Sequence, residues 1–90
     1  MKKNNKTLQE TYNEALLNYK EKDYDSAEVT CNKILNIDPN NFDTTLLSAS
    51  ISGAKGNYKK AKELLLKAVE IQPKNTTVYN NLGSACKALG

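Results

Sequence analysis

The sequence predicts an all-α solenoid, in which antiparallel helical hairpins stack in a row and each hairpin packs only on its neighbours. Three observations support this prediction. The chain of 90 residues repeats itself at a spacing of about 34 residues. Its apolar residues recur at helical spacing, and a proline follows the second helix of each repeat. We expect about five helices in a superhelical stack.

The repeat is the strongest signal in the chain. Residues 8–41 align with residues 42–75 at eight identical positions, which include small, aromatic and proline residues. A fixed spacing of this length is typical of stacked helical pairs. We therefore predict a flexible tail over residues 1–7, a full repeat over 8–41, a second over 42–75, and the first helix of a truncated third repeat over 76–90.

Each repeat is expected to hold two helices of roughly 13 residues, about 20 Å long, joined by a polar turn. The turns lie around Lys22 and Gly56. Proline cannot continue the helical hydrogen-bond ladder, so the second helices should end before Pro39 and Pro73. Their apolar faces are formed by Ala27, Cys31, Ile34 and Leu35 in the first repeat, and by Ala61, Leu64, Leu65, Ala68 and Val69 in the second.

Polar residues mark where the helices begin. Asn41 and Thr76 are expected to cap the first helices of the second and third repeats. Asp23 and Asp25 lie in the first turn beside the start of a helix, where capping is the ordinary role of a carboxylate.

The charged residues argue against catalysis and against nucleic-acid binding. All 13 basic residues are lysines, and the chain contains neither Arg nor His. Without His the usual general base and the commonest metal ligand are missing, and without Arg there is no bidentate fork for phosphate or guanine. We find no nucleophile–base pair, metal-ligand cluster or glycine-rich phosphate loop, and expect a non-enzyme without cofactor or metal.

The cysteines and the N-terminus indicate a cytoplasmic protein. Cys31 and Cys86 lie far apart without metal-ligand spacing, and we expect both to be reduced thiols in the core. The basic start is not followed by an apolar segment. No apolar run approaches the roughly 18 residues that a membrane span needs, so neither secretion nor membrane binding is expected.

At its repeat positions the sequence resembles the tetratricopeptide-repeat (TPR) family, whose pattern is W-x2-L-G-x2-Y, then A-x3-F, then P. The matching positions hold Tyr79, Leu82, Gly83 and Cys86 in the third copy; Thr45, Ser48, Ala49, Ser52, Ala61, Leu65 and Pro73 in the second; and Thr11, Glu14, Ala15, Asn18, Ala27, Cys31 and Pro39 in the first. The resemblance covers the chain after its first six or seven residues. Polar Glu14 and Asn18 suit the outer face of a terminal repeat.

The resemblance implies a right-handed superhelix whose concave face, lined mainly by first helices, binds a peptide or protein partner. The candidate groove residues are Tyr12, Asn13, Leu16 and Tyr19 in the first repeat, Leu46, Leu47, Ser50 and Gly53 in the second, and Asn80, Asn81, Ser84 and Lys87 in the third. An alternative for Tyr12, Leu16 and Tyr19 is burial within the first hairpin.

Two TPR subclasses allow the groove to be compared further. One binds the C-terminal carboxylates of chaperones through a cationic clamp. The matching positions here hold Tyr12, Leu16, Leu47, Thr77 and Asn81, none of them basic, so we expect no such clamp. The other, in O-linked N-acetylglucosamine transferases, binds peptide backbone through a ladder of asparagines. Asn13 and Asn81 match it, Leu47 breaks it, and an Asn-rich composition is the alternative explanation.

Two further surfaces have sequence signals. Lys55, Lys59, Lys60, Lys62 and Lys67 crowd the second repeat, as expected of a solvated convex face, with an acidic partner or nucleic acid as the alternative. The last helix should leave Leu82, Cys86 and Leu89 partly uncovered, which predicts either a longer array or self-association through that end.

Three functions therefore compete. The first is a non-catalytic protein-interaction module that binds a peptide in its concave groove. The second is a substrate-recruiting N-terminal segment of a larger transferase. The third is a scaffold that self-associates through its last helix. Fold alone does not decide between them, because binding sites are grafted onto folds.

Overall fold

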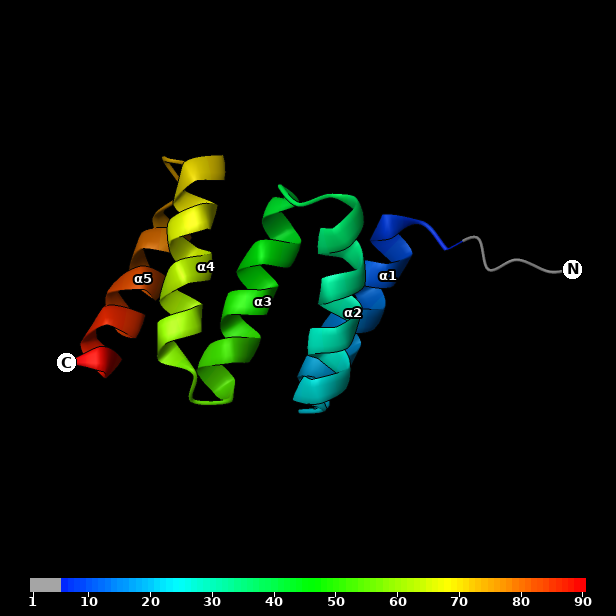
Figure 1. Cartoon of the computed structure of the whole chain (residues 1–90), viewed down its shortest axis with the longest axis horizontal. Coiled ribbons are helices and arrows are strands. Elements are labelled where there is room, and N and C mark those ends of the chain that lie inside the picture. The colour runs from blue at the N-terminus through cyan, green and yellow to red at the C-terminus, as the bar shows by residue number, and fades with distance from the viewer. Residues whose placement is uncertain (1–5) are drawn as a thin grey trace, which may run out of the picture.

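A computed structural model describes residues 6–90 and shows five helices that zigzag along one long axis (Figure 1). They are α1 (Leu8–Lys20), α2 (Tyr24–Ile37), α3 (Phe42–Ala54), α4 (Tyr58–Ile71) and α5 (Thr76–Leu89). No strand occurs within residues 6–90. The fold measures 52 × 26 × 17 Å, and each helix packs mainly on the helices before and after it. The predicted all-α helical-repeat architecture is confirmed.

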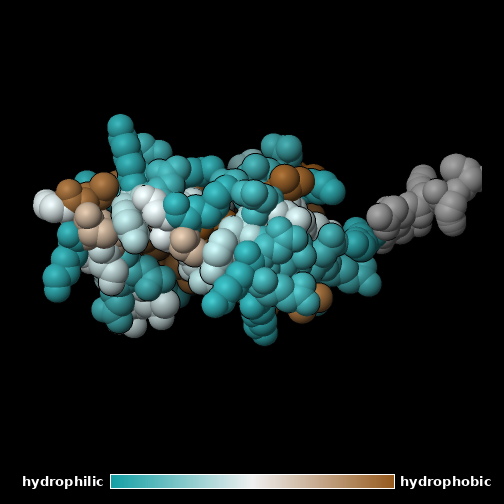
Figure 2. All heavy atoms as spheres, turned by 90° about the horizontal axis from the view of Figure 1, so that it is seen from below, coloured by the Kyte–Doolittle hydropathy of each residue, from teal (hydrophilic) through white to brown (hydrophobic). Residues whose placement is uncertain are grey.

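Most of the visible surface is hydrophilic in Figure 2, and the few hydrophobic atoms form small separate groups, one of them at the end of the molecule formed by α5. Of the tail expected over residues 1–7, residues 1–5 lie outside the described part of the chain. Thr7 is described, and it forms the N-cap of α1.

Each helix begins at a side chain that accepts a hydrogen bond from a backbone N–H of its first turn. The five N-caps are Thr7, Asp23, Asn41, Asn57 and Asn75. Asn41 accepts from the N–H of Thr44 at 3.0 Å, as the sequence predicted for this residue. The expectation for Thr76 was wrong by one residue. Asn75, which stands one repeat after Asn41, is the cap instead, and Thr76 is the first residue of α5.

The two hairpin turns share a left-handed residue at the same repeat position. Lys22 has a φ of 63°, and Gly56, its counterpart in the second repeat, has a φ of 81°. Glycine adopts this conformation without a steric penalty, whereas a side chain such as that of lysine meets the following carbonyl oxygen. The first turn therefore keeps the geometry of the second at some cost in strain.

The core consists of two clusters joined through α3. The first contains Ala15, Ala27, Cys31, Leu47 and Ile51, and the second contains Ala49, Leu65, Ala68, Val78 and Ala85. Two of the five residues in the first cluster and three of the five in the second are alanines, whose short side chains allow the helix axes to approach closely. Tyr12, Leu16 and Tyr19 pack against the first cluster and are half-buried, which agrees in part with the alternative of burial within the first hairpin.

An ion-pair network ties α2 to the α3–α4 turn. The Lys55 ammonium lies 2.7 Å from Asp25 Oδ1 and 3.0 Å from Glu28 Oε1, and the Lys60 ammonium lies 3.2 Å from Glu28 Oε2. Two of the five lysines expected to face solvent therefore have carboxylate partners. Hydrogen bonds from Lys55, then from Lys60, hold the pKa of Glu28 below its ordinary value.

This network predicts a specific pH dependence of stability. Because the pKa of Glu28 is lowered in the folded state, its contribution is present above the unfolded pKa and is lost as pH falls through the folded value. We expect Glu28→Gln to lower the free energy of unfolding by about 0.5–1 kcal/mol at pH 7. Near pH 2 the variant and the wild type should have the same free energy of unfolding. Urea denaturation at both pH values measures this difference. Glu63→Gln, which removes a carboxylate outside the network, should have no such effect; equal losses in both variants would contradict the prediction.

A buried hydroxyl pair on α3 gives a second prediction. Thr44 and Thr45 are both fully buried, and Thr45 Oγ1 donates to the Asn41 carbonyl at 2.9 Å, whereas Thr44 Oγ1 has no hydrogen-bond partner within residues 6–90. Thr44→Val should raise the free energy of unfolding by about 1 kcal/mol, because it removes an unsatisfied polar group. Thr45→Val should not raise it. Urea unfolding of both variants makes the comparison, and a loss of stability in Thr44→Val would refute it.

Candidate functional site

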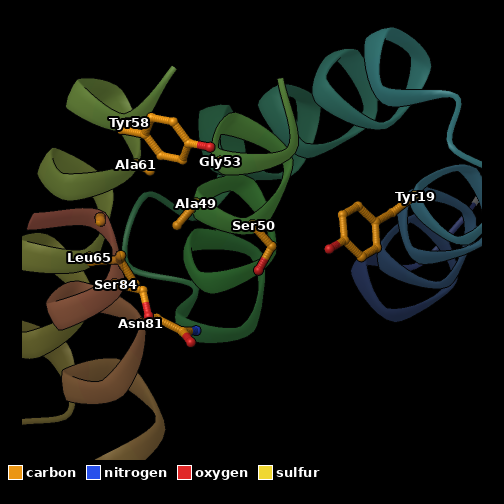
Figure 3. A pocket seen from close by; sticks show the side chains of 10 residues that line it. Tyr19, Ala49, Ser50, Gly53, Tyr58, Ala61, Leu65, Asn81 and Ser84 are labelled. Atoms are coloured by element: carbon orange, nitrogen blue, oxygen red, sulfur yellow. The ribbon is translucent and has the colours of Figure 1, made fainter. Parts of the chain in front are cut away.

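A groove of about 220 Å³ opens where α3, α4 and α5 meet, with one side chain of α1 at its edge. Five of the sequence-predicted groove residues line it: Tyr19, Ser50, Gly53, Asn81 and Ser84. Figure 3 shows Tyr58 of α4 lying near Gly53 of α3, and Tyr19 facing Ser50 from the α1 side. The groove therefore draws on all three repeat copies.

Five further residues line the groove: Ala49, Tyr58, Ala61, Leu65 and Ala85. The predicted site did not include them, because the alanines and Leu65 stand at helix-packing positions and Tyr58 begins a second helix. One sequence signal could have found this place. Tyr19 in the first repeat and Gly53 in the second occupy the same repeat position. Because glycine has no side chain, the space that the Tyr19 ring fills in the first repeat should be empty in the second.

The other predicted groove residues lie elsewhere. Leu47 is 6% exposed and belongs to the first core cluster, so it supports the fold and offers no surface. Leu46 packs on the second cluster and is half-buried, as Tyr12 and Leu16 are on the first. Burial, with a smaller contribution from Asp43, raises the pKa of Tyr12. The remaining three, Asn13, Asn80 and Lys87, are exposed and do not line the groove.

One repeat position that contributes to the groove is apolar in the second repeat and polar in the third. Leu47 fills the junction between α2 and α3, and Asn81 stands at the same position of the next repeat, at the junction between α4 and α5. The amide of Asn81 does not fill that junction, and the side chain lies on the groove wall (Figure 3). A large apolar residue at one interface is thus replaced by a polar residue at the next.

The chemistry of the groove is uncharged and suited to hydrogen bonding. None of its lining residues carries a charge. Ser84 Oγ donates to the Asn80 carbonyl at 3.2 Å, whereas the Asn81 amide makes no hydrogen bond within the described residues. A free amide can both donate and accept, which matches a peptide backbone. Ala49, Ala61 and Leu65 supply an apolar floor.

The exposed side of α5 is a second candidate surface. Tyr79 is 46% exposed and Leu89 is 47% exposed, and Leu82 is half-buried against the second core cluster. The Tyr79 hydroxyl donates to the Pro73 carbonyl at 2.6 Å. Cys86 is exposed, which corrects the expectation of a core thiol, whereas Cys31 is buried as predicted. The reason is that α5 packs mainly on α4, and no described helix covers its far side.

Within residues 6–90 no helix has both the length and the apolar content that crossing a bilayer requires.

The sequence and the structure of this chain are both similar to those of known proteins. A family model for the tetratricopeptide repeat matches residues 18–89. The chain is 33% identical over 67 residues to the UDP-N-acetylglucosamine–peptide N-acetylglucosaminyltransferase of Caenorhabditis elegans, a match that covers 74% of this chain and 6% of the transferase. It is also similar to the C-terminal TPR-containing domain of an FK506-binding protein from Plasmodium falciparum. That match has a TM-score of 0.83 and 29% identity, and covers 91% of this chain and 54% of the other.

The two cysteines predict a clear difference in reactivity. Burial, with a smaller contribution from Glu28, raises the pKa of the Cys31 thiol to about 11, so about a thousandth of it is thiolate at pH 8. Iodoacetamide should therefore modify Cys86 in the native protein and reach Cys31 only after unfolding in urea. Mass spectrometry of the labelled peptides measures this. The Cys86→Ser variant should take no label without urea, and native labelling of that variant would show the assignment to be wrong.

Proposed function

Because the chain belongs to the tetratricopeptide repeat family, we propose that it is a non-catalytic interaction module that holds an extended peptide segment in the groove between α3, α4 and α5. The tetratricopeptide repeat is a non-catalytic repeat fold with a general role in binding protein partners. The observation that supports this groove is its composition. An apolar floor is bordered by a free amide and hydroxyl groups, without charge. The repeat division at residues 8–41, 42–75 and 76–90, and a cytoplasmic location, belong to the same proposal.

Asn81 is the residue on which binding depends in this proposal. Its side chain reaches the groove wall and can accept from a peptide N–H while donating to a peptide carbonyl. Leu47 is in the core and Asn13 is exposed outside the groove, where its Oδ1 accepts from Gln9 Nε2 at 3.0 Å. A continuous asparagine ladder is therefore not part of the proposal, which relies on one amide.

The partner segment is uncharged at its point of contact. Tyr12, Leu16, Leu47, Thr77 and Asn81 stand where a carboxylate clamp would need cationic groups, and the groove lining contains no ammonium group. A peptide that ends in a free carboxylate would gain no ion pair there. The proposal therefore favours an internal segment of a partner protein over the C-terminus of a chaperone.

Similarity to the nematode transferase favours a second candidate function. The matched region covers 6% of that protein, and its name states that it acts on a peptide. Under this alternative the present chain recruits a peptide substrate for a catalytic domain. Peptides selected on the groove would then also be glycosylated by such an enzyme, which separates this alternative from a free-standing adaptor.

The exposed side of α5 favours a third candidate, in which two copies associate through Tyr79, Cys86 and Leu89. Sedimentation equilibrium of the reduced chain at rising concentration tests it. A monomer throughout the concentration range would exclude self-association while leaving the groove proposal intact.

The groove proposal predicts that two neighbouring asparagines differ in importance. Peptides are first selected on the wild-type chain from a displayed library, and their affinities are then measured by fluorescence anisotropy. Asn81→Ala should weaken binding about tenfold, since it removes two backbone hydrogen bonds of about 0.7 kcal/mol each. Asn80→Ala changes the adjacent, exposed side chain outside the groove and should leave the affinity within about twofold.

Thermal unfolding of both variants provides the control, because neither side chain is buried in the core. If Asn81→Ala binds the selected peptides as tightly as wild type does, the groove is not the binding site.

A further inference from the structure

The first hairpin contains an aromatic pair that the second hairpin lacks. The rings of Tyr19 and Tyr24 have centroids 5.7 Å apart and planes tilted by 53°, a geometry that aromatic pairs favour. Tyr24 corresponds to Tyr58 in the second repeat, so the second ring position is kept. Tyr19 corresponds to Gly53, so the first is vacant in the second hairpin. The first hairpin therefore contains both rings of the pair, and the second hairpin contains one ring beside a vacant position.

The unfilled version lies in the groove. Tyr58 is 40% exposed and lies near Gly53 at the groove wall (Figure 3). A Cβ atom placed on Gly53 would have no atom within 4 Å outside its own helix, so the space beside it is open. Small residues continue this space, because Ala49 and Ala61 lie on the groove lining between the two helices. We call the space between Gly53 and Tyr58 the aromatic slot.

We propose that the aromatic slot binds an aromatic side chain, Tyr or Phe, of an uncharged extended peptide, whose ring packs on Tyr58 as Tyr19 packs on Tyr24. This inference rests on the proposed function and names the side chain that the groove selects. The template comes from the same molecule, in which the corresponding position is already occupied by a tyrosine ring. No charged group lines the slot, so a cationic or anionic side chain would lose its hydration without a partner.

The neighbouring residues extend the same recognition to the peptide backbone. Ser50 and Asn81 border the groove and can hydrogen-bond the residues on either side of the inserted ring. Tyr19 faces Ser50 across the groove, so a second aromatic wall lies at the α1 end (Figure 3). A Tyr or Phe side chain flanked by small or polar residues fits this arrangement.

The test uses p-cresol, which is the tyrosine side chain without a backbone, together with the whole chain. Two-dimensional NMR should show saturable shifts of the backbone amides of Gly53 and Tyr58 with a Kd on the order of 1 mM. Tyr58→Ala should weaken binding about three- to tenfold, because one aromatic wall is removed. The saturated analogue 4-methylcyclohexanol should bind at least about threefold more weakly than p-cresol does.

Filling the slot from within should abolish binding. Gly53→Tyr places a ring in the second hairpin at the position of Tyr19 and should raise the Tm by about 4 °C, because a glycine in the last turn of α3 is also removed. It should lower the affinity for p-cresol at least about tenfold. The matched control is Gly83→Tyr, which adds the same ring at an exposed position of α5 outside the groove and should leave the affinity unchanged. Gly53→Leu fills the slot with a smaller side chain if the tyrosine variant does not fold.

The outcomes separate this inference from the proposed function. Unchanged p-cresol binding in a folded Gly53→Tyr or Gly53→Leu variant overturns the aromatic slot, as does an absence of shifts at Gly53 and Tyr58 in wild type. Equal binding of 4-methylcyclohexanol overturns the preference for an aromatic ring. If selected peptides still depend on Asn81 under any of these outcomes, the groove function stands and only its aromatic specificity is lost.

Discussion

The close approach of helices at alanine positions is the contact on which the rest of the structure depends. Ala15 and Ala27 are fully buried in the first hairpin, and Ala49 and Ala61 stand at the same positions in the second. Because these side chains are short, they allow the two helices of each hairpin to approach closely at equivalent positions. Residues next to these alanines differ between the repeats, as Tyr19 and Gly53 do. Ala49 and Ala61 themselves form part of the groove lining.

In a repeat protein, the same position can belong to the core in one copy and line a groove in the next. Leu47 closes the α2–α3 junction, whereas Asn81 leaves the α4–α5 junction open and polar. In the same way, the Tyr19 ring completes an aromatic pair, and Gly53 leaves the corresponding place open. The groove therefore arises without any insertion or loop, through one change in side-chain polarity and one in side-chain size between equivalent repeat positions.

The sequence predicted the parts of the fold that depend on local signals. The repeat period, the prolines after the second helices and the Asn41 cap are all legible along the chain itself, and the helices follow them. It did not predict contacts made across the stack. The pairing of Lys55 with Glu28 joins residues 27 apart, and periodicity does not reveal which helix faces bring such charges together. For the same reason it placed Leu47 in the groove and Cys86 in the core.

The buried side chains of the central helix, α3, affect both halves of the molecule. Four hydroxyl-bearing residues of α3 are buried, namely Thr44, Thr45, Ser48 and Ser52. These side chains are shorter than leucine or phenylalanine, so α3 interlocks less deeply with the helices on either side of it. Because α3 contributes to both core clusters and to the groove lining, a substitution that moves it would alter the packing on both of its sides and the shape of the groove together.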